Sequence, residues 1–595
     1  MCGIAGVAHT GDRRDLPGSA QVLAHRGPDG GRSVGWDANR ATGVLGHDRL
    51  AIVDLSERGQ QPMSDEHGRF LVAFNGEIYN HAELRRLCQT RGHRIRGRMD
   101  GEVIVHLWED EGEECLRRLN GIFAVAVVDT ATGTVWLARD PVGVKPLYHI
   151  AERTELWFAS EPRAIGELGA DLGAPDVVAL AQFLTFLWIP DPRTPFSRVR
   201  SVRPGHVMRW RPGRGPVSRR YTAPLYPEPD AKSLDVPTAM SELEQQLDAA
   251  CARQLLGDVP VGLMASGGID SSLLWWQAHD RLDGAYTIEW SRDADGERLD
   301  EDAEAVRALR NELGSPTTFI EGVAGGQIPA PPSGDLFADP AYELTRLIAA
   351  RARRDGCKVL WSGQGGDELL GGYRRHRVAW LLEDAFAGVL STLRPVTRML
   401  RAGSPRNEYA TRLVRAASGK DFFERYLHLC TYSDADDRAR VLGCSSAEVA
   451  DEVVWSSHRE IYDALPQGLS ALRRALALDL NVYLPGLGLA YVDRAGMEYG
   501  VEVRVPWLDL ELVRWSLTLP DKALAADGGK APARALARKA LPPLIADRPK
   551  RGFAAPIDRV RRSDRTAGSR GHRQGDYFAR AAEIVHTLSD TRRIA

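Results

Sequence analysis

A glycine- and serine-rich turn in the middle of the chain has the residue types of a phosphate-binding loop. Residues 261–272 read VGLMASGGIDSS, which predicts a buried strand, a glycine turn and a helix that begins at Ile269. Glycines let a ligand approach the backbone, and the free N–H groups at a helix N-terminus attract an oxyanion such as phosphate. The turn is not a Walker A loop, because the Gly-Lys-Ser/Thr ending is missing. The candidate phosphate-binding residues are Ser266, Gly267, Gly268, Asp270 and Ser271, and a purely structural turn is the alternative.

A second strand-to-loop junction follows further along the chain. The apolar run at 358–361 leads into SGQGGDELLGG, which begins with Ser362 and Gly363. Asp270 and Asp367 each lie just past the carboxyl end of a predicted strand, where an open parallel sheet places its ligands. Two carboxylates beside a triphosphate suit Mg²⁺, which keeps several waters and takes one or two protein oxygens. The strand between the junctions contains Ile288, a candidate wall for adenosine. The SGGIDSS turn resembles the pyrophosphate loop of enzymes that split ATP into AMP and pyrophosphate.

Cys2 is a candidate nucleophile at the other end of the chain. The sequence begins Met1-Cys2-Gly3, and removal of Met1 would leave Cys2 with a thiol and a free α-amine. A nucleophile needs a base within reach, and an N-terminal amine with a pKa near neutrality can supply one. The alternative is that Cys2 is one more small buried residue of a first strand.

Four further motifs stand in order behind Cys2. They are His25–Asp29 (HRGPD), Gly46–Ile52 (GHDRLAI), Asn75–Asn80 (NGEIYN) and Asp100–Glu102 (DGE). This set resembles the glutaminase domain of class II glutamine amidotransferases, which has the N-terminal-nucleophile fold. The resemblance implies that Cys2 attacks the glutamine amide and that Asn75 and Gly76 form the oxyanion hole. It also implies that Arg49 binds the α-carboxylate of glutamine, while Glu77 and Asp100 bind its α-ammonium. Taken singly, Asn75-Gly76 could be a hairpin turn, and Arg49 and Asp100 surface charges.

Secondary-structure patterns indicate how these residues are positioned. Short apolar runs predict strands at 70–74, 121–128 and 135–138, with helices at 82–91 and 101–111 between them. Proline, arginine and glycine are frequent at 204–237, which predicts a linker. Helical spacing resumes at 239–256, just before the SGGIDSS turn.

Motifs near the C-terminus extend the resemblance to the asparagine synthetase family, from Met1 to about Pro556. They are Leu484-Pro485, Val492–Arg494, Val501–Asp509 and Arg548–Phe553. The resemblance implies an α+β (αββα) glutaminase domain at 1–210, a linker at 211–237 and a parallel-sheet α/β ATP-pyrophosphatase domain at 238–560. It implies that Lys550 faces the α-phosphate and that ammonia passes through an internal tunnel. Residues 561–595 are expected to form a flexible tail, since Arg561–Gly575 is polar and basic.

The chain departs from the family pattern near the expected acceptor pocket. Gln364 replaces the glutamate of the family's Ser-Gly-Glu-Gly-Ser-Asp-Glu loop, and an amide cannot act as a general base near pH 7. The family also prefers Asp after Leu-Pro and a polar or basic residue near Tyr491. We therefore expect a glutamine-dependent amide synthetase whose carboxylate acceptor is a natural-product intermediate. Ordinary asparagine synthesis from aspartate is the alternative, and a cyclase of the β-lactam synthetase or lasso-peptide type is the third reading.

The amino-acid composition limits the kinds of partner and location expected for the protein. The 595 residues are too many for one core, so two or more domains are expected. A formal charge of −3 gives no support for nucleic acid or an anionic membrane as a partner, and no apolar run or signal peptide predicts a membrane location. Seven scattered cysteines without a Cys-x-x-Cys pair predict reduced thiols and a cytoplasmic enzyme. The expected partners are glutamine, ATP with Mg²⁺ and the acceptor, and a homodimer is compatible with the sequence.

Overall fold

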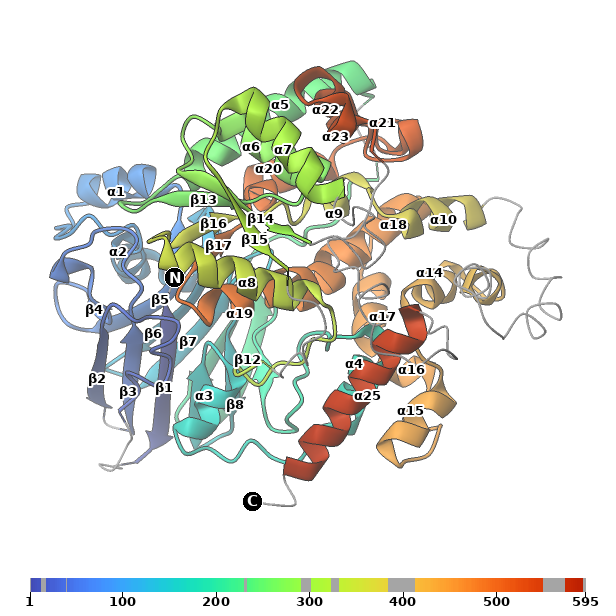
Figure 1. Cartoon of the computed structure of the whole chain (residues 1–595). Helices are drawn as coiled ribbons and strands as arrows, with labels where there is room; N and C mark the ends of the chain where they lie inside the picture. Colours follow the sequence, from blue (N-terminus) through green and yellow to red (C-terminus); the bar gives the residue numbers. More distant parts are fainter. Residues whose placement is uncertain are drawn as a thin grey trace.

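Two stacked antiparallel sheets form the N-terminal part of the protein (Figure 1). A computed structural model describes residues 2–11, 18–38, 40–229, 233–290, 301–322, 331–383, 412–548 and 573–591. One sheet has the strand order β10 (Arg200–Ser201), β8 (Tyr148–Ala151), β9 (Glu155–Ala159), β1 (Gly3–Thr10), β3 (Ala41–Asp48), β2 (Gly31–Ala38). The other has the order β12 (Arg214–Arg220), β11 (His206–Arg211), β7 (Thr134–Arg139), β6 (Gly121–Asp129), β5 (Phe70–Ile78), β4 (Met63–Ser64).

Helices cover the outer faces of both sheets. Helices α1 (His81–Thr90) and α2 (Glu102–Glu111) pack on the sheet that contains β5, and α3 (Pro162–Glu167) packs on the sheet that contains β9. Apolar side chains of β1, β5 and β6 meet between the sheets, so every residue of β5 is buried rather than every second one. This architecture confirms the predicted αββα N-terminal-nucleophile fold.

A five-stranded parallel sheet forms the core of the C-terminal part. Its order is β15 (Thr317–Glu321), β14 (Gly284–Glu289), β13 (Val261–Met264), β16 (Val359–Trp361), β17 (Glu502–Arg504). Helices α5 (Val236–Gln254), α6 (Ile269–Ala278) and α7 (Glu301–Leu313) cover one face, and α8 (Ala341–Arg354) and α19 (Leu489–Met497) cover the other. The chain starts at the central strand β13, runs to β15 on one side and returns to β16 on the other. The gap between the carboxyl ends of β13 and β16 is therefore the topological switch point, where such sheets bind ligands.

Short helices complete both parts. The N-terminal part contains η1 (Glu57–Gly59), η2 (Gly112–Arg118) and α4 (Val177–Phe186). The C-terminal part contains α9 (Gly366–Leu370), α10 (Arg374–Glu383), α14 (Phe422–Cys430), α15 (Ala435–Leu442), α16 (Asp451–Val454), α17 (Ser456–Asp463), η4 (Pro506–Leu508), α20 (Leu510–Leu517), α21 (Asp521–Ala525), η5 (Ala526–Gly528), α22 (Ala531–Ala540) and α23 (Pro543–Ala546).

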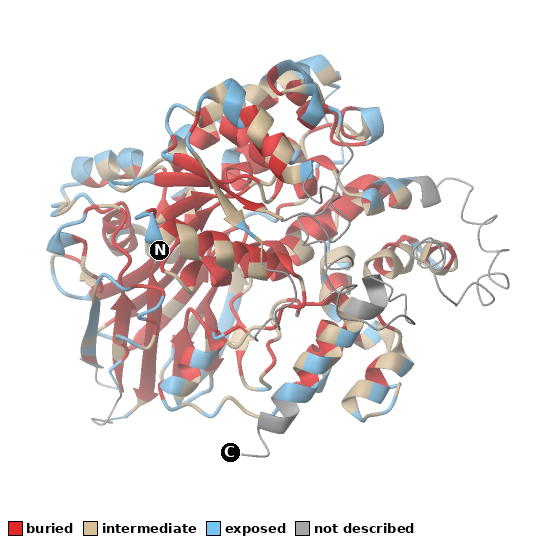
Figure 2. Cartoon of the chain, viewed as in Figure 1, coloured by how far each residue is buried: buried red, intermediate tan, exposed pale blue. Residues whose placement is uncertain are grey.

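One continuous helical run crosses the middle of the molecule. It consists of α18 (Ala471–Leu478), the wider π-helical segment η3 (Asp479–Gly488) and α19. The run at 471–497 is apolar and long enough to cross a membrane by length and composition, but 78% of its apolar window is buried inside the fold. Figure 2 shows it as mostly buried, which is the pattern of a core helix.

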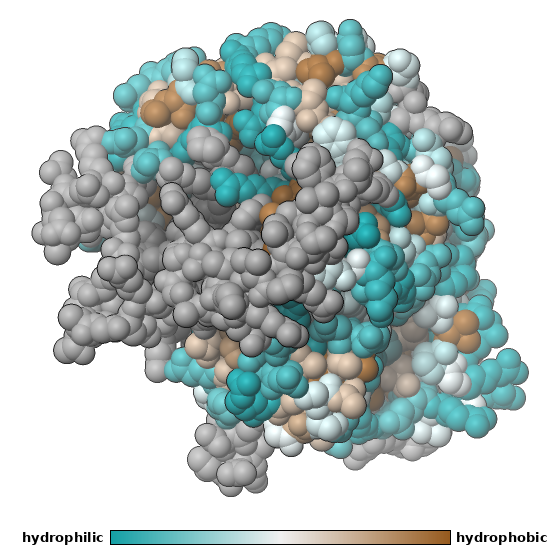
Figure 3. Space-filling view, turned by 90° about the vertical axis from the view of Figure 1, so that its right-hand side faces the viewer, coloured by the Kyte–Doolittle hydropathy of each residue, from teal (hydrophilic) through white to brown (hydrophobic). Residues whose placement is uncertain are grey.

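The structure differs from two predicted boundaries. Strand β12 lies inside the predicted linker 211–237 and extends the N-terminal sheet, since arginine and glycine can alternate in an exposed edge strand. The predicted flexible tail 561–595 contains α25 (Arg573–Thr591), which buries Ala581 and Val585 against α4. On the described part of the face in Figure 3, hydrophobic residues occur only in small groups among hydrophilic ones.

Candidate functional site

Cys2 lies at the start of β1, held against Asn75 of β5. The backbone N–H of Cys2 donates to Asn75 Oδ1 at 2.9 Å, and both residues are buried. The other amide atom of Asn75, Nδ2, has no hydrogen-bond partner among the described residues. One amide side chain therefore fixes the nucleophile and keeps a donor free beside it, as an oxyanion hole requires. Because Asn75 and Gly76 lie within a strand, the hairpin-turn reading is wrong.

Gly76 and Cys2 are both tightly enclosed. A Cβ at Gly76, where φ is +141°, would lie 1.8 Å from the carbonyl oxygen of Ile122, so only glycine fits. Burial raises the pKa of the Cys2 thiol, and the nearby N-terminal amine opposes that rise. The thiol consequently needs a base to form the thiolate, and the α-amine that Cys2 would carry after removal of Met1 is the candidate.

The three predicted glutamine-binding residues are buried rather than exposed. Arg49 donates Nη1 to the carbonyl oxygen of Ser56 at 2.7 Å and also hydrogen-bonds Asp54, which excludes the surface-charge reading. Asp100 accepts the backbone N–H of Ile78 at 2.5 Å. Burial raises the pKa of Glu77 well above its usual range, and the negative charge of Asp100 adds to the rise. The two buried carboxyl groups, Glu77 and Asp100, suit the binding of an added ammonium, which supports their predicted roles.

The two loops predicted to bind ATP, at 265–271 and 362–367, meet at the switch point, where they line a cleft of about 330 Å³. At Gly267, where φ is +66°, a Cβ would lie 2.7 Å from the carbonyl oxygen of Asp302. A Cβ at Gly363 would lie 2.8 Å from the backbone nitrogen of Ser271, so the two loops touch through their backbones. The hydroxyls of Ser266 and Ser271 are 3.0 Å apart, which shapes the first turn.

The predicted nucleotide residues line this cleft with one exception. Ser266, Gly267, Gly268, Asp270, Ser271, Ser362 and Gly363 are all in its wall. Ile288 is not, because its side chain is buried in the apolar core on the α8 face of the sheet. Lys550 lies outside the described residues, so its predicted role stays a prediction.

Asp270 and Asp367 converge on Lys530, which the sequence analysis missed. The Lys530 ammonium lies 2.8 Å from Asp367 Oδ1 and makes an ion pair with Asp270. Lys530 is buried at the start of α22 and follows two glycines, the only sequence signal that could have marked it. The two carboxylates suit Mg²⁺ in type and position, and Lys530 offsets their charge.

The two acceptor candidates are in contact. Gln364 Nε2 donates to the hydroxyl of Tyr491, which lies on α19. Tyr373 and Tyr483 line the same cleft with ring centroids 5.9 Å apart. Glu368 also lines it and accepts from the Tyr373 hydroxyl at 2.7 Å. Burial and the charge of Asp367 raise the pKa of Glu368 to about 7, so this carboxyl can exchange a proton near neutrality.

Buried ion pairs join the two halves. Arg504 of β17 lies 3.2 Å from Glu77, and its carbonyl oxygen accepts the N–H of Ser362 at 2.9 Å. Arg26, which has no exposed surface, lies 3.0 Å from Asp493 of α19 and 2.8 Å from Glu161. Glu77, a predicted glutamine-binding residue, and Ser362, at the start of the second cleft loop, thus both contact Arg504 at the end of β17.

Comparisons with known proteins agree with this arrangement. The family model for a glutamine amidotransferase domain matches residues 1–222, and the model for asparagine synthase matches residues 242–586. Asparagine synthetase [glutamine-hydrolyzing] 1 of Bacillus subtilis is 28% identical over 94% of this chain and 87% of its own length. A putative asparagine synthetase [glutamine-hydrolyzing] of Mycobacterium bovis is 30% identical over 91% of this chain and 83% of its own length. The chain belongs to the asparagine synthase family and carries an N-terminal glutamine amidotransferase domain.

Proposed function

We propose that the protein is a glutamine-dependent, ATP-consuming amide synthetase that releases AMP and pyrophosphate. The observation that carries this proposal is the shared junction: Cys2, Asn75 and Glu77 lie on one side, the two-loop cleft lies on the other, and Arg504 contacts both. A protein that used only one site would have no need to keep both sets of residues in contact.

In the glutaminase half, the Cys2 sulfur attacks the side-chain amide carbon of glutamine once Met1 has been removed. The α-amine accepts the thiol proton and returns it to the departing nitrogen, so ammonia leaves and a thioester remains. Asn75 Nδ2 donates to the oxyanion, and water then hydrolyses the thioester to glutamate. Arg49 holds the α-carboxylate of glutamine, and Glu77 with Asp100 holds its α-ammonium.

In the synthetase half, an oxygen of the acceptor carboxylate attacks the α-phosphorus of ATP and pyrophosphate leaves. Backbone N–H groups of the SGGIDSS turn hold the phosphates, and Asp270 with Asp367 would hold Mg²⁺, which supplies charge neutralisation. Ammonia, delivered through an internal passage between the sites, attacks the acyl carbon and AMP departs. The nitrogen loses a proton in this step. Glu368, which lines the cleft and has a pKa of about 7, can accept that proton.

The acceptor is a carboxylate other than aspartate. Three cations line the described cleft: Lys530 contacts the two aspartates, Arg548 contacts Asp302, and Arg534 hydrogen-bonds Gly529. All three therefore belong to the phosphate end. Gln364 and Tyr491 form a neutral, aromatic end, and no described residue in the cleft wall there is a cation that could pair with the second carboxylate of aspartate. An aromatic or otherwise uncharged acid, such as a natural-product intermediate, fits better.

Asparagine synthesis is the alternative that the relatives' names favour. A cyclase is less well supported, because the buried Cys2–Asn75 contact would have no role in it. A cytoplasmic location belongs to this proposal, since all seven cysteines are unpaired. A homodimer stays a prediction.

The test is a screen of carboxylic acids for glutamine-dependent release of pyrophosphate and AMP. We expect an uncharged or aromatic acid to be turned over much faster than aspartate. Cys2→Ala should abolish synthesis with glutamine and preserve it with ammonium, while the matched Cys444→Ala, at a partly exposed position, should change neither. Release of ADP, or aspartate as the best acceptor, would contradict the proposal.

A further inference from the structure

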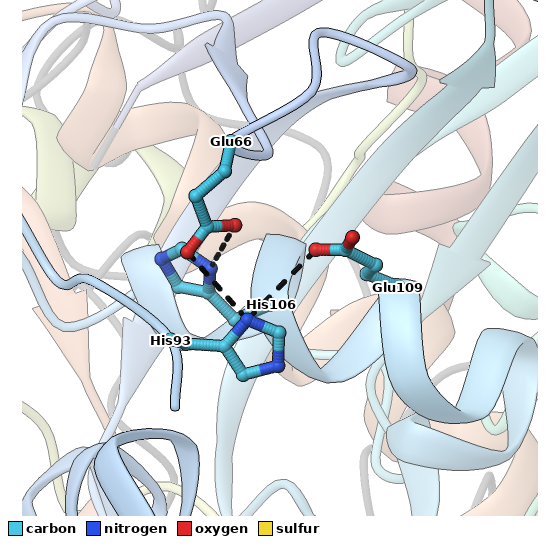
Figure 4. A group of neighbouring side chains, drawn as sticks. All are labelled: Glu66, His93, His106 and Glu109. Carbon is cyan, nitrogen blue, oxygen red and sulfur yellow. Dashed lines mark ion pairs between the residues drawn. The ribbon is translucent and has the colours of Figure 1, made fainter. Parts of the chain in front are cut away.

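Four metal-ligating side chains meet in the glutaminase domain, away from Cys2 and the ATP cleft. Glu66 lies in the turn between β4 and β5, His93 in the loop after α1, and His106 and Glu109 one helical turn apart on α2 (Figure 4). The chain elements are distant in sequence, so the cluster is produced by the tertiary fold. Each residue can offer one nitrogen or oxygen, and these four atoms all lie within 4.8 Å of one another.

The separations between these atoms approach those of a tetrahedral site. Glu66 Oε2 lies 3.3 Å from His106 Nδ1, and Glu66 Oε1 lies 3.6 Å from His93 Nδ1. Glu109 Oε2 lies 3.8 Å from His93 Nδ1. Ligands about 2.1 Å from a central zinc ion in tetrahedral geometry are roughly 3.4 Å apart, so small side-chain movements would close the shell.

The surroundings of His106 indicate a metal ligand rather than a core histidine whose nitrogens are hydrogen-bonded. Its side chain is only 3% exposed, and neither ring nitrogen has a hydrogen-bond partner among the described residues.

His93 shows the outer-shell contact that metal-bound histidines usually have. Its Nδ1 faces Glu66 and Glu109, while its Nε2 lies 3.2 Å from Asp110 Oδ1. This contact lacks hydrogen-bond geometry, and a small rotation of either side chain would let Nε2–H donate to the carboxylate and orient the imidazole. The backbone N–H of Arg94 donates to Glu66 at 2.9 Å and orients that carboxylate in turn.

We propose that Glu66, His93, His106 and Glu109 bind a zinc ion that is separate from the two reaction sites. Two imidazoles and two carboxylates suit Zn²⁺ better than Mg²⁺, because Mg²⁺ prefers oxygen ligands. A site with four protein ligands is closed, so the ion is structural rather than catalytic. It fastens the 91–101 loop, which contains Asp100, to α2 and to the turn before β5.

The experiment measures metal in the full-length protein purified without a histidine tag. We expect about one zinc per chain to survive dialysis, and Co²⁺ added to the metal-free protein should give the visible absorption of a tetrahedral site. A chelator should lower the thermal midpoint of the wild type.

Three variants separate the proposed site from ordinary ion pairing. His93→Asn and His106→Gln should each lose the zinc, the cobalt spectrum and the response to chelator. His67→Asn is the matched control, because His67 lies 3.7 Å from Glu109 but is 78% exposed. If His106→Gln fails to fold, the test rests on His93→Asn, at a less buried position, and on the cobalt titration of the wild type. Substoichiometric zinc with no cobalt spectrum, or equal metal in His93→Asn and wild type, would overturn the proposal without touching the proposed amide synthesis.

Discussion

Arg504 Nη2 lies 3.2 Å from Glu77 Oε1, across the boundary between the glutaminase and synthetase halves. Arg504 also pairs with Glu502 on its own strand and is fully buried. These negative charges hold the pKa of Arg504 above its already high value, against the effect of burial. The guanidinium is thus the shared cation of two buried carboxylates, one from each half.

Replacing Arg504 by Met should destabilise the protein by about 3 to 5 kcal/mol, because two buried carboxylates lose their counter-charge. Urea unfolding followed by circular dichroism measures this loss. Arg514→Met is the control, since Arg514 lies on α20 with an exposed side chain, and it should change stability by less than about 0.5 kcal/mol. Equal midpoints for the two variants would show that the Arg504 pairs contribute nothing.

Lys530→Met should lower pyrophosphate release by roughly 10²- to 10³-fold, because Asp270 and Asp367 would then repel the triphosphate without a neighbouring ammonium. Hydrolysis of glutamine alone, which takes place at Cys2, should be unaffected. Both rates are measured on the same preparation. Lys522→Met, at an exposed position eight residues earlier, should leave pyrophosphate release at the wild-type rate.

Amide formation from ammonia should fall as the pH drops through about 7. Burial raises the pKa of Glu368, so its carboxylate accepts a proton near neutrality and then cannot act as a base. The rate is measured at constant free ammonia, so that titration of ammonium does not produce the same slope.

Glu368→Gln should remove this inflection and lower the rate by about 10²- to 10⁴-fold. Glu312→Gln, at an exposed position on α7, should retain the pH profile. An unchanged profile in Glu368→Gln would assign the proton transfer to another group.

The loops could be predicted from sequence because their chemistry is local. An apolar run, a glycine turn and a helix start within twelve residues predict one geometry, and both cleft loops have it. Lys530 could not be predicted, since 260 residues separate it from Asp270 and only the tertiary fold brings them together. The cluster of Glu66, His93, His106 and Glu109 was missed because the fold brings together a turn, a loop and a helix that carry no shared motif.

Helix α25 was missed for a different reason. Its apolar residues recur with helical spacing at Tyr577, Ala581, Val585 and Leu588, but a charged and glycine-containing stretch precedes them. The average composition of residues 561–595 is polar, and it hides the short amphipathic helix at their C-terminal end. The structure packs this helix on α4 and brings Tyr577 into the wall of the ATP cleft.

Ala581→Asp should detach α25, because a carboxylate would then be placed at a fully buried position in the apolar contact with α4. Tyr577 would leave the cleft, so we expect the KM for the acceptor to rise about tenfold or more while glutamine hydrolysis keeps its rate. Ala579→Asp adds the same charge two residues earlier on the exposed side of the helix and should change neither quantity. Limited proteolysis reports detachment directly, since a released helix is cleaved first. If Ala581→Asp were cleaved as slowly as Ala579→Asp and kept the wild-type KM, α25 would have no part in the acceptor site.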